Sequence, residues 1–231
     1  MEDVCFVYKK TREGEFLKDL LEDFSGVLIS DFYSAYDSIK CRHQRCLIHL
    51  IRDLNDDLLK NPFDEDYKNL VQKFSTLLRT IIYTVDQYGL KRRHLLKHKK
   101  DVLKFFVYLE TNEYRSDLYL KYKRKLLRQR ERLFVFLEDD GIPWNNNNAE
   151  RAIKSFALFR RESKGLFSEQ SIKKYLILLS LYQTCSFKGV DFLGFMLSRE
   201  TNIDKFIDKY GYSKNIHYVH KLKGSISKTL N

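Results

Sequence analysis

Acidic side chains next to predicted strand and helix ends are the residues of this sequence best suited to metal chemistry. Asp31 directly follows the apolar run Val27–Ser30, which we interpret as a buried strand. Open α/β sheets bind their ligands beyond the carboxyl ends of strands, so this position favours a ligand-binding role. Taken alone, Asp31 is better explained as a cap of the turn at 33–37 that follows the strand. Glu150 opens an amphipathic segment, where a first-turn acid that stabilises the helix dipole is the ordinary alternative.

Cysteine and histidine side chains gather in one short stretch and raise the question of a zinc site. Cys41, His43, Cys46 and His49 are separated by one, two and two residues. No familiar zinc finger has this spacing, so zinc binding is kept only as an alternative.

Positive charge is concentrated in one part of the chain, whose formal net charge is +11. Residues 91–132 contain 15 Lys or Arg and five acidic residues. A local excess of this size attracts phosphate backbones, with a solvated helix face as the alternative. His94 and His98 are one turn apart in this stretch and are expected on such a face. The predicted DNA contacts here are Arg92, Arg93, Lys97, Lys123 and Arg124.

Hydrophobic periodicity predicts the elements that must position these side chains. The strand signals are the apolar or β-branched runs Val4–Tyr8, Val27–Ser30 and, weakened by its polarity, Cys41–Cys46. Helices are expected at 11–24, 47–61, 70–88, 102–109, 118–137 and 192–196, and a further helix is expected to begin near Asn147. The apolar segment 172–185 is expected to be a core helix, and residues 221–231 are expected to be a frayed tail.

The composition of the chain excludes several classes of protein. Nine Gly and two Pro in 231 residues indicate long helices with few tight turns. No run of ~18 apolar residues could span a bilayer, the first residues do not look like a secretory signal, and four irregularly spaced Cys do not suggest a disulfide framework. Strands alternating with helices indicate the α/β class. We expect a cytoplasmic protein with no membrane partner.

Four segments, taken in order, resemble the transposases of the insertion sequence 66 family, which are of the DDE type. The resemblance extends over roughly residues 4–195. Its motif residues include Tyr36, Cys46, His49, Asn146 and Asn147. The segments are GVLISDFYSAY at 26–36, HQRCLIHLIRDL at 43–54, NNNAERAIK at 146–154 and the pair Thr184-Cys185.

The resemblance implies a ribonuclease-H-like core with an incomplete sheet, a large α-helical insertion and a helical C-terminal region. The implied divisions are 1–54 and 139–200 for the core, 55–138 for the insertion and 201–231 for a tail. Asp31 and Glu150 match the second and third catalytic acids, which hold two Mg²⁺ or Mn²⁺ ions in the intact family site. The first catalytic Asp is expected upstream of this chain, which by itself is then expected to be inactive.

The resemblance also implies a prokaryotic, nucleoid-associated DNA transposase that cleaves and joins DNA at transposon ends. DNA is the expected partner, and a homodimer on DNA is expected. Arg52, Arg151 and Lys154 are expected phosphate contacts near the metal site. The alternatives are a non-catalytic DNA-binding module and an inactive transposase remnant.

Overall fold

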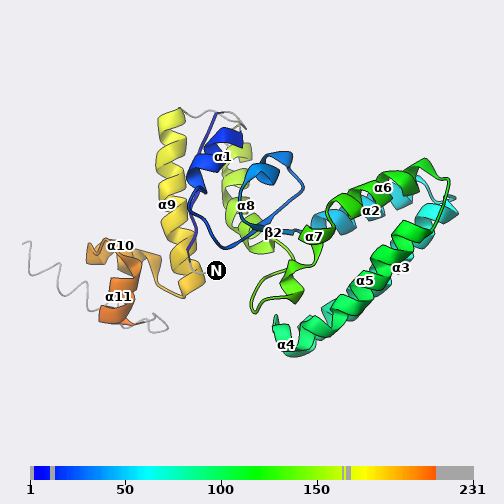
Figure 1. Ribbon diagram of the computed structural model, residues 1–231. Helices are drawn as coiled ribbons and strands as arrows, with labels where there is room; N and C mark the ends of the chain where they lie inside the picture. The colour runs from blue at the N-terminus through cyan, green and yellow to red at the C-terminus, as the bar shows by residue number, and fades with distance from the viewer. Residues whose placement is uncertain (1–2, 11–13, 163, 165–167, 212–231) are drawn as a thin grey trace, which may run out of the picture. The chain divides into compact units, whose positions relative to one another are not determined.

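A computed structural model describes residues 3–10, 14–162, 164 and 168–211 (Figure 1). The chain divides into two compact units. Residues 13–146 form one, here called the sheet–helix unit, and residues 1–12 with 147–231 form the other, here called the terminal unit. Each is described by itself. The predicted tail at 221–231 and the expected helix start at Thr11 lie outside the described residues.

A two-stranded parallel sheet starts the sheet–helix unit. β1 (Val27–Ser30) pairs with β2 (Arg42–Arg45), and Ser30 is opposite Arg45. Both predicted strands are confirmed. Helix α1 (Gly14–Leu20) precedes the sheet, and the 3₁₀ turn η1 (Ser34–Ser38) lies between the strands.

Helices make up the rest of this unit. α2 (Leu47–Lys60) and α3 (Glu65–Tyr88) confirm two predicted helices. Asp64 caps α3 by accepting the Tyr67 N–H at 2.9 Å, and Gly89 ends it at a φ of 68°. The remaining elements are α4 (Arg92–Leu95), η2 (Leu96–His98), α5 (Lys99–Thr111), α6 (Asp117–Arg128), α7 (Arg130–Leu133) and η3 (Val135–Leu137).

One apolar core holds these helices together, because each contributes a stripe of buried side chains. Leu50 from α2, Phe74 from α3, Phe106 from α5 and Leu126 from α6 are at most 1% exposed. Figure 1 shows α2 and α6 side by side, and α3 alongside α5, in the helical part that follows the sheet.

The single helix predicted over 118–137 is interrupted at Gln129 and again after Leu133, and the buried Gln44 makes hydrogen bonds at the second break. The Gln44 Nε2 amide donates to the Leu133 carbonyl at 2.8 Å, and its Oε1 accepts the Phe136 N–H at 3.0 Å. These bonds from β2 satisfy backbone groups that a continuing helix would pair internally. The chain therefore leaves the helical path after Leu133 and packs against the sheet.

The terminal unit consists of α8 (Asn147–Glu162), α9 (Glu169–Lys188), α10 (Phe192–Ser198) and α11 (Ile203–Tyr210). Its small core contains Cys185, Val190, Phe195 and Phe206. The expectation that α9 is wholly core is wrong in part, because Ile177 is 61% exposed.

The strand predicted at Val4–Tyr8 is not formed. This extended segment lies along α9, where the Val4 N–H donates to Thr184 Oγ1 at 3.0 Å and the Phe6 N–H donates to Ser180 Oγ at 2.9 Å. The β-branched and aromatic residues of this segment suggested pairing with a strand, but hydroxyl groups of α9 accept its hydrogen bonds instead.

The fold agrees with the α/β class at the level of a small parallel sheet joined to many helices. A ribonuclease-H-like core is not established by a sheet of two strands. In the described part of the chain, no helix combines the length and apolar character needed to cross a bilayer.

Protonation of His98 is expected to destabilise the sheet–helix unit. His98 was expected on a solvated face, but it is 3% exposed and its Nε2 lies 2.8 Å from Thr84 Oγ1. Burial, with a smaller effect of Lys97, lowers the pKa of His98 despite the opposing charge of Asp101. The unfolded chain therefore binds this proton more readily, and the stability contribution is complete above about pH 6.5 and is lost as pH falls toward the lower folded value.

The urea midpoint followed by circular dichroism should fall between about pH 7 and pH 5, and His98→Gln should make that decrease smaller. An unchanged pH dependence in the variant would contradict the assignment of this effect to His98.

The two hydroxyl contacts along α9 predict a residue-specific pattern of amide exchange. Thr184→Val should speed hydrogen exchange of the Val4 amide, and Ser180→Ala should speed that of Phe6, because each change removes the acceptor of one N–H. Each variant serves as the control for the other when exchange is followed by NMR. Equal acceleration of both amides in both variants would argue against two separate bonds.

Candidate metal and nucleic-acid sites

Asp31 occupies the carboxyl end of β1, as the sequence predicted. Its Oδ1 accepts the Tyr33 N–H at 3.0 Å, which fixes the carboxylate at the start of the turn that leads into η1. The side chain is half-buried. Tyr36, a motif residue in η1, packs edge-on against Tyr33, and burial with the nearby Asp31 charge raises the pKa of Tyr36.

A buried arginine lies directly beside this strand end. Arg45 Nη1 donates to Ser30 Oγ at 2.6 Å and to the Asp31 carbonyl at 2.6 Å. Its Nη2 forms an ion pair with Asp37, which also pairs with Arg132. Burial lowers the pKa of the Arg45 guanidinium, and the charge of Asp37 opposes that effect.

Sequence reasoning missed Asp37, Arg45 and Arg132. The available signal was the polarity of the strand Cys41–Cys46, because a strand whose polar residues are buried must pair them with partners elsewhere in the fold.

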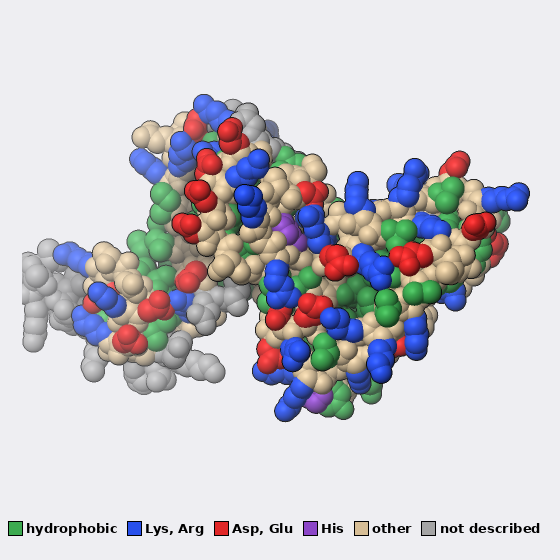
Figure 2. Space-filling model, viewed as in Figure 1, with side chains coloured by type: hydrophobic (Ala, Val, Ile, Leu, Met, Phe, Trp, Pro, Cys, Tyr) green, Lys and Arg blue, Asp and Glu red, His purple; other side chains and the backbone are tan. Residues whose placement is uncertain are grey.

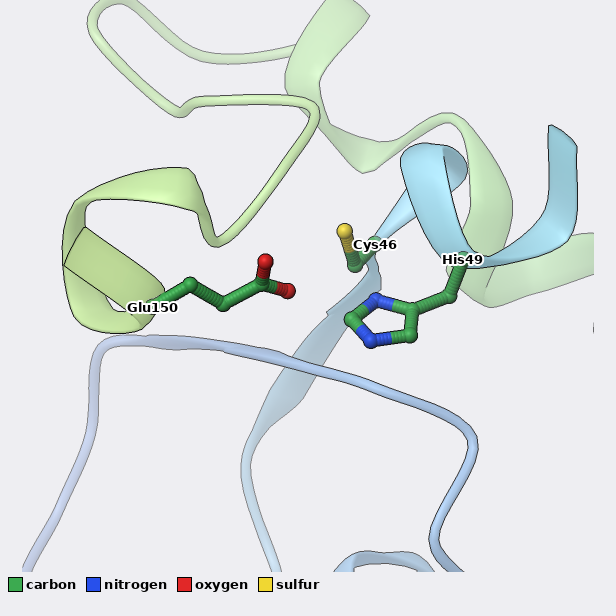
Figure 3. Close-up of side chains that lie close together, drawn as sticks. All are labelled: Cys46, His49 and Glu150. Atoms are coloured by element: carbon green, nitrogen blue, oxygen red, sulfur yellow. The ribbon is translucent and has the colours of Figure 1, made fainter. Parts of the chain in front are cut away.

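Cys46 and His49 lie at the junction of β2 and α2 (Figure 3). The Cys46 Sγ atom and a His49 ring nitrogen are within 4.8 Å of each other. Cys46 is fully buried, and its Sγ accepts the Asn146 N–H at 3.4 Å. Two motif residues of the sheet–helix unit, Cys46 and Asn146, are therefore in contact.

The four-residue zinc alternative is not supported by the geometry. His43 Nε2 lies 2.9 Å from the Ile39 carbonyl and 3.9 Å from Cys41 Sγ. Within the described ranges, neither Cys41 nor His43 joins Cys46 and His49 in a group close enough to share an ion. The His43 ring instead satisfies a backbone carbonyl inside the unit.

Glu150 lies in the first turn of α8, in the terminal unit. The side chain extends from this turn (Figure 3) and is half-buried. Arg151 and Lys154 on the same helix are exposed. Tyr175 of α9 stacks on Phe159 of α8 at a centroid distance of 4.1 Å, which ties the two helices together.

The predicted basic region consists of two kinds of cation. On α6, Lys121 pairs with Asp57 at 2.9 Å and Lys125 with Asp53 at 2.7 Å. Lys123 donates to the Asn112 carbonyl, and Arg124 donates to the Leu120 carbonyl of its own helix. Lys and Arg side chains alternate with Asp and Glu on the face of the helices in Figure 2.

The cations around α4 and η2 are different. We call this group the basic elbow, and it comprises Lys91, Arg92, Arg93, Lys97 and Lys100. All five side chains are exposed, and none has a carboxylate at ion-pair distance within the described residues. Outside the basic elbow, the predicted DNA contact Arg52 is exposed on α2.

Comparison with known proteins identifies the family. No curated protein and no solved structure matches the chain. A family model described as "Transposase IS66 family" matches residues 1–174, which is most of the chain. This span includes β1, β2, the helical part and α8, and therefore every motif segment up to residue 154. The chain belongs to the IS66 family of transposases.

Proposed function

We propose that this chain is part of a DDE-type transposase, which cleaves and joins DNA at transposon ends, and that Asp31 and Glu150 are the second and third of its catalytic acids. The observation that carries the proposal is the placement of Asp31 at the carboxyl end of a parallel strand, with its backbone bonded to Arg45 and its carboxylate oriented by Tyr33. Family membership supports the same reaction class.

The side chains fit a hard divalent cation. Asp31 and Glu150 offer carboxylate oxygens, which Mg²⁺ and Mn²⁺ prefer over softer ligands. When bound, a pair of such ions activates the attacking oxygen and stabilises the leaving oxygen of a phosphodiester. Arg151 and Lys154 on α8 supply exposed cations for the DNA backbone beside Glu150. A ribonuclease-H-like core and a homodimer on DNA complete the proposal.

Removal of either acid is expected to weaken metal binding. Asp31→Asn and Glu150→Gln keep the side-chain volume and remove a carboxylate, so each should lower Mn²⁺ affinity at least about tenfold in titration calorimetry of the full chain. Any Mn²⁺-dependent nicking of supercoiled DNA should be lost in both variants.

Asp53→Asn is the matched control, because Asp53 is a carboxylate of the same unit that pairs with Lys125. Wild-type Mn²⁺ affinity in both acid variants would overturn the metal assignment. DNA binding with no measurable Mn²⁺ affinity in the unaltered chain would favour the non-catalytic DNA-binding module.

DNA binding through the basic elbow follows from the distribution of ion pairs. A phosphate that contacts Lys121 or Lys125 must compete with Asp57 or Asp53, whereas the elbow cations have no such competitor within the described residues. Release of counterions by unpaired cations provides most of the affinity for a phosphate backbone. The elbow is therefore a stronger contact surface than Lys121 and Lys125. Lys123 and Arg124 contribute less because their side chains already donate to backbone carbonyls.

Two matched double variants test this difference. Arg92→Ala with Lys97→Ala should lower DNA affinity and reduce the slope of log K against log salt by about two, one unit for each lost phosphate contact. Lys121→Ala with Lys125→Ala removes the same formal charge and should change the slope much less. Fluorescence anisotropy with a labelled duplex over a salt series measures both, and equal slopes in the two variants would contradict the proposed surface.

A further inference from the structure

The charge arrangement around Arg45 has a consequence for Asp31. The Arg45 side chain is 0% exposed, so its guanidinium has no water to pair with and must bond to the protein. Four hydrogen bonds are formed: two from Nη1 to Ser30 Oγ and the Asp31 carbonyl, one from Nη2 to Asp37, and one from Nε to Gln129 Oε1 at 3.4 Å.

Two carboxylates lie near this cation. Asp31 and Asp37 are the acids whose charges act on the Arg45 guanidinium. A bidentate pair between arginine and Asp31 would be the usual solution for a buried cation. Arginine instead contacts the Asp31 backbone carbonyl, and Asp37 accepts the charged Nη2 group.

Asp37 is well placed for this task because it faces two cations at once. Its Oδ1 accepts hydrogen bonds from Arg45 and from Arg132, which comes from α7. The Asp37 carboxylate is thus held by the partly exposed Arg132 and by the buried Arg45 of β2. The Asp31 carboxylate retains only the Tyr33 N–H as a hydrogen-bond partner among the described residues.

We propose that Asp37 is a positioning residue that holds Arg45 on the backbone of Asp31 and so leaves the Asp31 carboxylate available to a divalent cation. The inference rests on the proposed metal-binding role of Asp31. Without the Asp37 charge, Asp31 is the carboxylate left to neutralise the buried guanidinium. An ion pair between Arg45 and Asp31 would then occupy the oxygens that the metal needs.

Mn²⁺ binding to the full chain tests the proposal without any need for catalysis. Asp37→Asn should weaken Mn²⁺ binding about tenfold to a hundredfold, the usual effect of losing a group that orients a metal ligand. Asp37→Glu keeps the charge and should recover most of the affinity. Glu110→Gln, which removes the 2.9 Å ion pair to Arg130, is the matched control and should bind Mn²⁺ like the unaltered chain.

A double-mutant cycle separates this role from a general loss of stability. In an Asp31→Asn background, Asp37→Asn should have no further effect on Mn²⁺ affinity, because Arg45 then has no Asp31 carboxylate with which to form an ion pair. Thermal unfolding without metal reports the stability of each variant, and Arg45→Lys, which keeps the charge but not the planar donor set, gives a second perturbation of the same contact.

The outcomes distinguish the two proposals. If Asp31→Asn leaves Mn²⁺ binding unchanged, the metal-binding role of Asp31 fails. If Asp31→Asn abolishes binding while folded Asp37→Asn and Arg45→Lys bind normally, the positioning role of Asp37 fails and the metal site stands. Equal losses from Asp37→Asn in the presence and absence of the Asp31 carboxylate would also overturn the positioning role.

Discussion

The buried Arg45 guanidinium is the contact on which the sheet–helix unit depends most. It joins Ser30 of the first strand and Asp31 at the strand's end to Asp37 in the following turn and to Gln129 after α6. A buried cation that loses a partner costs several kcal/mol, so these segments have to be in place together. The strand end, the turn and the junction of two helices are therefore held in one arrangement by a single charge.

Local pattern was sufficient for most elements of the fold. The apolar run of β1 and the helical stripes of α2, α3, α5 and α9 follow from side chains that must be buried on one face, and their positions agree with the structure. The end of α7 could not be found in this way, because the bonds that replace its helical partners come from Gln44, distant in the sequence. The extended segment at Val4–Tyr8 has strand-like residues, yet Thr184 and Ser180 are its partners.

Some residues of the candidate site could likewise be predicted from the local sequence, and others could not. Asp31, Cys46 and His49 were found because they belong to contiguous motifs with a recognisable order. The ion pairs of Asp37 were not, because they depend on the register of two strands and on a helix that follows much later in the chain. The burial of His98 was hidden for a similar reason, since a basic local sequence says nothing of the helix packed against it.

The helical part of the sheet–helix unit begins and ends at one point. The Leu47 N–H, at the start of α2, donates to the Trp144 carbonyl at 3.0 Å, and the Cys46 thiol accepts the Asn146 N–H at 3.4 Å. Closing a loop whose ends already touch costs little more as the loop grows, so the strand end does not sense how many helices lie between. The number of helices between these two contacts is therefore not constrained by the strand end itself.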